Sequence, residues 1–406
     1  MAEDFTALYE LNRDGLCEAS CSTVSHTREN AVVELETVGM PNNRLEYWKY
    51  SRIGKVLKDL NINLSNKSSA IADSLEKPKD SSFEILSLNE AIKTNHPAIE
   101  KHLTQHASIK NNGLTALNTA FFSDGIFMNI PDNTDVADPI YIPNTRSEAD
   151  GVIDHPRNLI VVGENSSVTI ISETASEDNA QSSLVNAVEE VIVGNNAQVK
   201  QYVLQNALQN EVNSIYVRQG RDSIYTRVTT TLKGAFIRNN INVIMDGTGS
   251  ESNLYGYYHI TGKSQVDNHT VVEHQQPDCV SNELYVGLLD DDASGIFNGR
   301  VWVHQDAQRT NAFQSNKNIL LSDNATMNTK PELEIYADDV KCSHGATIGQ
   351  VDPEALFYLQ SRGIPKQKAM AMLLQGFSIE VLDMISDEKF RDKVLNLVLE
   401  QLSVSQ

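Results

Sequence analysis

Between about residues 116 and 350 the chain is a succession of short apolar runs, each broken by Gly, Asn, Asp or Ser. Three segments share one plan: an apolar run, a small residue, Asn or Asp, then Ser or Ala, and a new apolar position. They are residues 158–168, 189–199 and 318–327, with the sequences NLIVVGENSSV, EEVIVGNNAQV and NILLSDNATM. Gly tolerates positive φ, and Asn and Asp side chains bond to their own backbone, so each segment predicts a strand, a tight turn and another strand.

Many short strands at fairly regular spacing are typical of a β-sandwich, a β-barrel or a β-solenoid. A repeated strand–turn–strand unit favours the solenoid, because its stacked turns bury one continuous apolar interior. The spacing of the units is loose, so the pattern alone places a solenoid only a little ahead of a sandwich.

The regions on either side of these strands are predicted to be helical. In the first, Ser87–Glu90 is a capping box that opens a helix, and the polar stretch over residues 63–82 has the composition of a mobile segment. We therefore predict a mainly β protein with helical ends, divided into an N-terminal mainly helical domain, a β core and a C-terminal helical domain. Their ranges are 1–115, 116–350 and 351–406.

The C-terminal region opens at residues 352–354, Asp-Pro-Glu, where an Asp cap, Pro at the first helical position and an acidic first turn predict a helix start. A second helix follows Pro365, and in it Met372, Leu373 and Phe377 share a face. A helical cluster of this size cannot hold a core by itself. It must therefore pack on the β region or on a partner.

The charge and the cysteine content limit the partners and the compartment. The chain has 54 acidic and 33 basic residues and a net charge of −21, which argues against nucleic acid and anionic membrane surfaces as partners. No apolar run approaches the roughly 18 residues of a membrane span, and the acidic start lacks the apolar segment of a secretory signal. Four cysteines are too few for a disulfide framework, so we expect a reducing cytoplasm.

Two Cys–His pairs are candidate metal ligands. Cys342 and His344 lie two positions apart on a predicted strand, which puts both side chains on one face. His274 and Cys279 flank a predicted turn. Thiolate and imidazole suit iron or zinc, but two ligands do not complete a site, and on spacing alone a buried cysteine beside a hydrogen-bonded histidine is the better explanation of each pair. Cys17-x3-Cys21 is a helix-compatible pair with no neighbouring ligands.

Four long segments resemble the SufB/SufD family of iron–sulfur cluster assembly scaffold proteins. ADDVKCSHGATIG followed by LFYLQSRGI is similar to the family's C-terminal core, and PNNRLEYWKYSRI to its N-terminal segment. FFSDGIFMNIPDN resembles the entry to its central domain, and residues 269–303 resemble its middle. The SufD branch fits better, because the SufB branch carries Glu where this chain has Gly345.

This resemblance implies a parallel right-handed β-helix core flanked by helical domains. It implies a non-catalytic scaffold subunit of the SUF complex, which forms a heterodimer with a SufB-like subunit and docks a SufC-like ATPase through the region of Met372, Leu373 and Phe377. It places His344, and less firmly Cys342, at the heterodimer interface, where a nascent iron–sulfur cluster or iron is held. We expect no cofactor to stay bound to the isolated chain, and a homodimer formed through exposed strand edges when the partner is absent.

The alternative is a cytoplasmic β-solenoid carbohydrate-active enzyme that uses paired carboxylates such as Asp291 and Asp292. An aromatic content of 6% weakens this hypothesis, because sugar-binding grooves usually contain stacking rings. The Asp290–Asp292 cluster is also typical of a solvated turn. The position of the acids distinguishes the hypotheses, since a hydrolase or lyase needs them in mid-groove on the flank of the solenoid.

Overall fold

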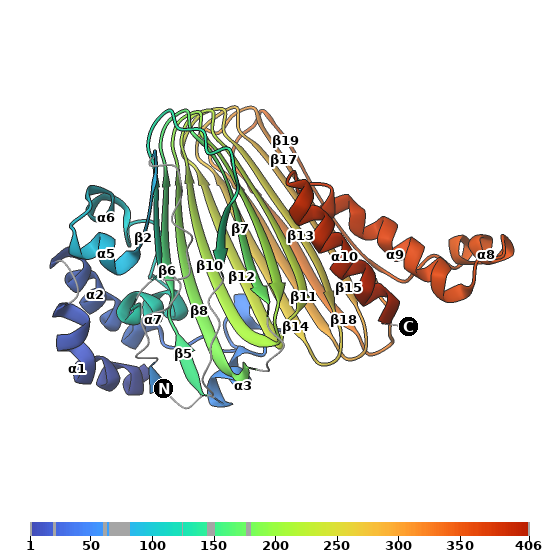
Figure 1. Ribbon diagram of the computed structural model, residues 1–406, viewed down its shortest axis with the longest axis horizontal. Helices are drawn as coiled ribbons and strands as arrows, with labels where there is room; N and C mark the ends of the chain where they lie inside the picture. The colour runs from blue at the N-terminus through green and yellow to red at the C-terminus, as the bar shows by residue number, and fades with distance from the viewer. Residues whose placement is uncertain are drawn as a thin grey trace.

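The computed structural model describes residues 2–18, 22–59, 63–64, 82–123, 125–143, 151–175 and 180–404. Its centre is a parallel β-solenoid of about 7 turns, in which the chain passes alternately through two facing sheets (Figure 1). The parallel solenoid with helices at both ends, as predicted from the strand–turn pattern and the family resemblance, is confirmed.

Within the described residues, one sheet has 11 strands and the other has 8. The 11-stranded sheet contains β1 (Asn63–Leu64), β2 (Glu84–Ser87), β3 (Ile126–Ile130), β5 (Val152–Asp154), β6 (Arg157–Val162), β8 (Ala180–Val193), β10 (Gln209–Gln219), β12 (Phe236–Met245), β14 (Gln265–His274), β16 (Ser294–Val303) and β18 (Thr326–Ile335). The 8-stranded sheet contains β4 (Ile140–Pro143), β7 (Ser167–Ala175), β9 (Gln198–Asn206), β11 (Ile224–Lys233), β13 (Glu251–Ile260), β15 (Val280–Leu289), β17 (Thr310–Leu320) and β19 (Val340–Gly349).

A stack of left-handed residues forms one edge of the solenoid. Asn133, Asn165, Asn196 and Asp222 each have φ between 54° and 58° and occupy the same place on successive turns. The Nδ2 of Asn196 donates to Oδ1 of Asn165, and the Nδ2 of Asn165 donates to Oδ1 of Asn133, both at 3.0 Å. Asn and Asp tolerate this conformation better than other residues with side chains, which explains their recurrence in the sequence.

The three similar sequence segments do not all lie at this edge. Those over residues 158–168 and 189–199 form the β6–β7 and β8–β9 turns, which stack on each other. The segment over 318–327 instead links β17 back to β18, so its turn lies at the opposite edge. Side chains that form hydrogen bonds between successive turns of the solenoid are 26 to 32 residues apart in the sequence. This variation in the length of a turn explains why the spacing of the sequence units is loose.

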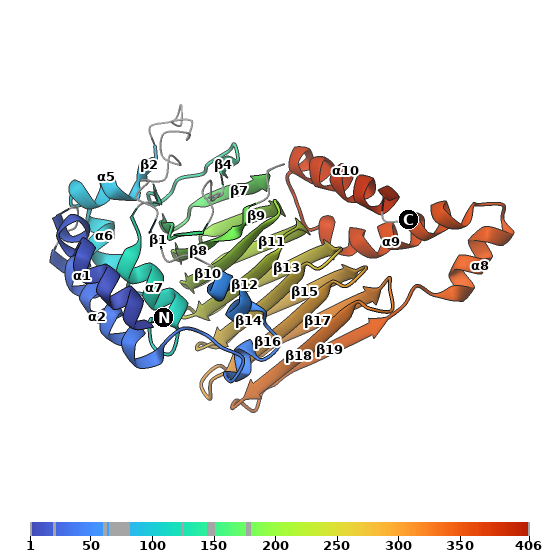
Figure 2. The same ribbon diagram turned by 90° about the horizontal axis from the view of Figure 1, so that it is seen from below.

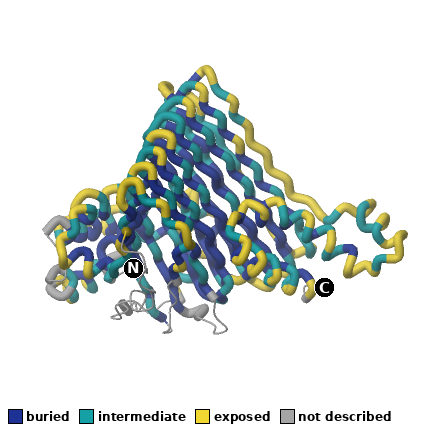
Figure 3. Tube along the Cα trace, turned by 45° about the horizontal axis from the view of Figure 1, so that its top comes forward, coloured by how far each residue is buried: buried dark blue, intermediate teal, exposed yellow. Residues whose placement is uncertain are grey.

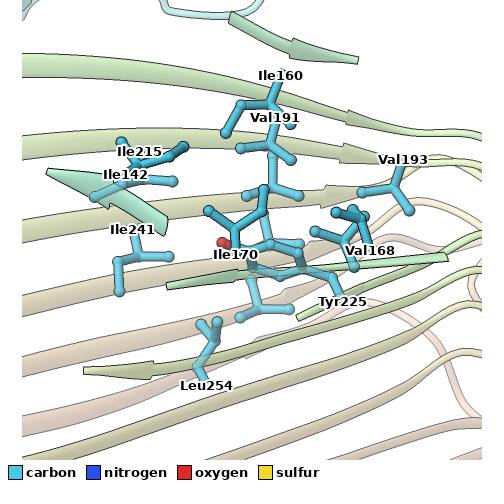
Figure 4. Close-up of a cluster of buried hydrophobic side chains, with 14 of the residues drawn as sticks. Ile142, Ile160, Val168, Ile170, Val191, Val193, Ile215, Tyr225, Ile241 and Leu254 are labelled. Atoms are coloured by element: carbon cyan, nitrogen blue, oxygen red, sulfur yellow. The ribbon is translucent and has the colours of Figure 1, made fainter. Parts of the chain in front are cut away.

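The core lies between the two sheets and consists mainly of Val and Ile with several tyrosines (Figure 4). Inward-facing side chains of one sheet, Ile160, Val191, Ile215 and Ile241, meet those of the other, Val168, Ile170, Tyr225 and Leu254. Side chains alternate along each strand, so every second residue enters this interior. Burial is continuous through the middle turns and decreases toward β18 and β19 (Figure 3).

The N-terminal helices pack on the outer face of the 11-stranded sheet (Figure 2). There Leu35 and Leu117 join a cluster with Leu184 and Val212 of the strands. The helices are α1 (Ala2–Glu18), α2 (Ser22–Val38), the 3-10 helix η1 (Glu46–Trp48), α3 (Ile53–Asp59), α5 (Leu88–Lys93), α6 (Pro97–His102) and α7 (Gly113–Phe121).

Two local predictions for this region can be compared with the structure. Ser87 caps α5, with its Oγ accepting from the backbone N–H of Glu90 at 3.0 Å, so the predicted helix start is confirmed. The predicted boundary between residues 115 and 116 falls inside α7, and the first solenoid strand, β3, begins ten residues later, at Ile126. The polar stretch over 63–82 lies outside the described residues except for 63, 64 and 82.

The C-terminal region forms α8 (Pro353–Ser361), α9 (Lys366–Leu382) and α10 (Glu388–Val404), with Asp352 capping α8 through the N–H of Glu354 at 2.9 Å. Helices α9 and α10 cover the outer face of the 8-stranded sheet, whereas α8 extends away from it (Figure 2). Ser378 donates to the hydroxyl of Tyr257 at 3.1 Å. In the described part of the chain, no helix combines the length and apolar character needed to cross a membrane.

The residues of α9 that are buried are not those of the predicted partner-binding stripe. They are Ala369, Leu374, Ser378, Val381 and Leu382. Of the predicted stripe, Phe377 packs at the margin of this cluster, whereas 44% of Met372 is exposed. The apolar surface left free on these helices therefore includes Met372.

Candidate functional site

The last turn of the solenoid, formed by β18 and β19, is open to solvent. Neither strand contains a buried residue, and within the described ranges β18 and β19 are the terminal strands of their sheets. The backbone N–H and C=O groups along these edges can pair with a strand of another chain. Ile335 and Ile348, which are 38% and 47% exposed, add apolar surface to this end.

His344 stands on β19 in a column of inward-facing residues. It pairs in register with Gln314 of β17, which pairs in turn with Glu283 of β15. Gln314 and Glu283 are each 3% exposed, whereas His344 is exposed because the solenoid ends there. His344 therefore extends a buried polar column to the open end of the molecule.

Cys342 lies two positions before His344 on the same face of β19, as the strand pattern predicts. It packs beside Val301, Val303 and Ala312 at the margin of a small cluster. Partial burial raises the pKa of its thiol, although a backbone hydrogen bond with Ala312 opposes the rise. Because only the thiolate is a strong metal ligand, Cys342 is a weaker ligand in the isolated chain than an exposed cysteine would be.

The backbone around His344 leaves room for an approaching partner. A Cβ atom built on Gly345 or Gly349 would meet nothing within 4 Å. A groove of about 430 Å³ lies alongside, lined by residues of four neighbouring strands that include Phe313, Gln314, Ser343, His344 and Gly345. This end of the molecule combines a free sheet edge, a soft-ligand pair and open space.

Glu283 and Gln314 form a hydrogen-bonded network behind His344. The Nε2 of Gln314 donates to Oε1 of Glu283 at 3.1 Å, and the hydroxyl of Thr270 donates to Oε2. Burial raises the pKa of Glu283 to about 7, although these two hydrogen bonds act in the opposite direction. The sequence analysis missed both residues, because a polar residue at an inward position of a strand cannot be recognised until the register is known.

The pair His274 and Cys279 lies inside the solenoid with separate partners. The Nε2 of His274 is 2.9 Å from the hydroxyl of Ser281, and burial lowers the pKa of this histidine to about 4. The thiol of Cys279 donates to the carbonyls of Gly247 and Pro277 at 3.4 and 3.5 Å. Both residues are 0% exposed, and the Nδ1 of His274 is buried without a hydrogen-bond partner.

Among the residues that the structure describes, no three His, Cys, Asp or Glu side chains form a group that could hold a metal ion. His344 and Cys342 accordingly belong to no such group. Cys21 lies outside the described residues, as does the side chain of Cys17. The structure therefore does not test the Cys17–Cys21 pair.

The aspartate cluster lies in a turn at the edge of the solenoid. Asp291 has φ of 52°, and its Oδ2 accepts from the backbone N–H of Gly262 at 2.9 Å. Oδ1 of Asp290 accepts from the N–H of Asp291 at 2.8 Å. These carboxylates shape the β15–β16 turn, and neither Asp291 nor Asp292 lines the groove beside His344. Their position at the edge argues against the carbohydrate-active alternative.

A second hollow of about 600 Å³ forms where the EYWKY segment lies on the outer face of the 11-stranded sheet. The guanidinium of Arg238 stacks 3.7 Å from the ring centroid of Trp48 and donates to the carbonyl of Tyr47 at 2.8 Å. Lys330 of β18 pairs with Glu46 at 2.6 Å. These contacts hold the EYWKY segment against β12 and β18 of the 11-stranded sheet, and β18 belongs to the open last turn.

Comparisons with known proteins agree with this architecture. A family model described as the SufBD core domain of SUF system FeS cluster assembly matches residues 145–377, and one described as the SufBD protein N-terminal region matches residues 1–77 and 74–142. An iron–sulfur cluster assembly SufBD family protein from Synechocystis is 30% identical over 90% of this chain and 88% of its own length. The iron–sulfur cluster assembly protein SufD of Bacillus subtilis is 30% identical over 79% of this chain and 74% of its own length. That of Escherichia coli is 37% identical over 42% and 40%.

Proposed function

The chain belongs to the SufBD family of iron–sulfur cluster assembly proteins, and from this premise we propose that it is a SufD-like, non-catalytic scaffold subunit of the SUF complex. It pairs with a SufB-like subunit, docks a SufC-like ATPase and works in the cytoplasm. The observation that carries the proposal is the open last turn, on which the inward-facing column ends at His344, exposed to solvent beside a free strand edge.

The heterodimer forms by strand addition to the last turn. The two edge strands contain no buried residues and expose Ile335 and Ile348, and the space beside Gly345 and Gly349 is open. Such a surface can pair with the end strands of a second solenoid. Two copies of this chain pair through the same edges when the partner is absent, because a two-fold contact is the commonest way to cover such an edge. Light scattering of the isolated chain should then give the mass of a dimer, and a monomer at high concentration would contradict this.

Iron or a nascent cluster is the cargo of this interface, and it does not remain on the isolated chain. His344 supplies an imidazole, and Cys342 supplies a thiolate once a partner or metal removes its proton. Among the described residues at the end of the solenoid, His344 and Cys342 are the soft ligands, and a cluster that needs about four takes the rest from the SufB-like subunit.

We expect the variant His344→Ala to lower iron bound per heterodimer at least about tenfold while leaving the fold intact. His344 is exposed at the end of the solenoid, and substitutions at exposed positions usually change stability by about 0.5 kcal/mol or less. Elemental analysis of the co-purified complex and a melting curve on the same sample measure both quantities.

The matched control is His304→Ala, which removes an imidazole outside the last turn that is paired with Glu273 at 2.7 Å. The heterodimer that contains this variant should bind as much iron as the heterodimer of the parent protein. If His344→Ala keeps its iron but melts well below the parent protein, then His344 is a structural residue and its proposed role is wrong.

The ATPase docks on the exposed apolar surface of α8 and α9. Phe357 is 72% exposed and Met372 is 44% exposed, whereas the other face of α9 is already buried against the solenoid. Deleting residues 352–406 would not test this surface, because it would also uncover Tyr202, Tyr257 and the rest of the cluster beneath α9 and α10.

The double variant Phe357→Ser, Met372→Ser should therefore weaken binding of the purified ATPase at least about tenfold, with little change in melting temperature. Loss of two well-packed apolar contacts is commonly enough for such an effect. Isothermal titration calorimetry measures the Kd. Leu11→Ser is the control, because Leu11 is 83% exposed on α1 at the other end of the molecule. Equal Kd values for the double variant and the control would rule out this surface.

A further inference from the structure

His344 continues a register column in which Gln314 and Glu283 are buried and polar, whereas the next member, Leu254 of β13, is buried and apolar. Glu283, Gln314 and His344 occupy the same register position on β15, β17 and β19. Parallel strands lie about 4.8 Å apart, so the side chains of successive members are direct neighbours. Burial of the Glu283 carboxyl and the Gln314 amide costs free energy unless both groups form hydrogen bonds.

The amide of Gln314 is held in one orientation. Its Nε2 donates to Glu283, whose second oxygen is occupied by the Thr270 hydroxyl. Gly299, on the facing strand β16, provides the space, since a Cβ atom there would lie 2.3 Å from Nε2 and 2.8 Å from Cδ of Gln314. Any larger residue at 299 would displace the amide.

This orientation leaves one polar atom unsatisfied. Oε1 of Gln314 is buried and has no hydrogen-bond partner, although the residue is only 3% exposed. A buried acceptor without a donor destabilises the folded state. The next member of the column is His344, whose imidazole N–H is a donor of the kind that Gln314 lacks.

We propose that Glu283 and Gln314 are positioning residues for His344: Gln314 Oε1 accepts a hydrogen bond from one ring nitrogen of His344 and so fixes which nitrogen stays unprotonated. The unprotonated nitrogen then points to the partner side of the interface. Metal-binding histidines commonly donate their other N–H to a carbonyl or carboxylate in this way, and loss of that acceptor costs about 10- to 100-fold in metal affinity. The inference rests on the proposed role of His344 at the cluster interface.

The test uses the full-length chain labelled with ¹⁵N-histidine and read by long-range ¹⁵N–¹H NMR, with the His344 signal assigned by its loss in His344→Ala. In the parent protein, one neutral tautomer of His344 should dominate. Gln314→Met keeps the length of the side chain but removes the acceptor, so it should give a mixture of tautomers. Glu283→Leu releases the amide and should do the same, which provides a second variant if Gln314→Met does not fold.

Glu283→Gln is the conservative control, because the new amide still offers Gln314 an acceptor oxygen and should preserve the single tautomer. Iron bound by the heterodimer should fall at least about tenfold in Gln314→Met and remain near the parent value in Glu283→Gln. An unchanged tautomer in Gln314→Met overturns the hydrogen bond while leaving the proposed function intact. Full iron in His344→Ala instead overturns the proposed function, whatever tautomer the NMR reports.

Discussion

Replacing Arg157 by methionine is expected to lower the free energy of unfolding by about 3–5 kcal/mol. Arg157 and Glu190 form an ion pair in which both side chains are 0% exposed. The Nη2 and Nε of Arg157 donate to Oε2 of Glu190 at 2.7 and 3.2 Å. Removal of the cation leaves a buried carboxylate without its counter-charge, and the loss of that compensation accounts for most of the expected effect.

This pair also joins the N-terminal helical region to the solenoid. Glu190 accepts from the backbone N–H groups of Thr104, His106 and Ala107 at 2.9 to 3.1 Å, and the Nη1 of Arg157 donates to Asn118 and Thr119 of α7. Burial by itself would raise the pKa of Glu190, but Arg157 and these backbone donors hold it below its usual value. The variant should therefore loosen the helices as well as destabilise the strands.

Denaturant unfolding monitored by circular dichroism measures the decrease in the free energy of unfolding. Arg218→Met is the matched control. Arg218 pairs with Asp246 at 2.5 Å, but their side chains are 45% and 35% exposed, so this pair should contribute at most about 1 kcal/mol. The double variant Arg157→Met, Glu190→Gln should be more stable than Arg157→Met alone, because it removes the uncompensated charge and keeps an oxygen that can accept from the backbone N–H groups. Equal losses for Arg157→Met and Arg218→Met would contradict the assignment.

The solenoid could be predicted because its turns need particular residues. Asn165 and Asn196 are in the left-handed conformation that the G-x-N pattern indicates, and they stack on successive turns. The sequence could not show at which edge of the solenoid the third segment, residues 318–327, would lie. The turns at both edges use the same residue types. The predicted first boundary falls inside helix α7, because all nine residues of this helix are buried, including the polar Thr115, Asn118 and Thr119, and no change in polarity marks where it ends.

The candidate site was predictable only in part. A period of two places Cys342 and His344 on one face of a strand, and the structure has that strand. The same period cannot say which face is the interior, so Glu283 and Gln314 resemble solvent-facing residues in the sequence. On α9, both Leu373 and Leu374 are apolar, and only the packing against the sheet shows that Leu374 is the buried one.

Glu283 makes the stability of the protein depend on pH in a direction opposite to that of most carboxylates. Its pKa is about 7 in the folded protein because of burial, against an ordinary value of 4.5. The folded state therefore holds a proton that the unfolded state releases between these two pH values. In this interval the Glu283 contribution to stability falls as pH rises, and above about pH 7 it stays constant because both states are ionised.

Glu283→Gln should consequently stabilise the protein at pH 8 by roughly 3 kcal/mol and change little near pH 4.5, since one pKa unit corresponds to about 1.4 kcal/mol. The glutamine resembles the protonated acid and can keep the hydrogen bonds to Thr270 and Gln314. Unfolding free energies of both proteins at pH 5, 6, 7 and 8 measure the difference, with the exposed Glu36→Gln as a control that should stay within about 0.5 kcal/mol of the parent throughout. A stabilisation by Glu283→Gln that is the same at every pH would show that packing, rather than the buried proton, accounts for it.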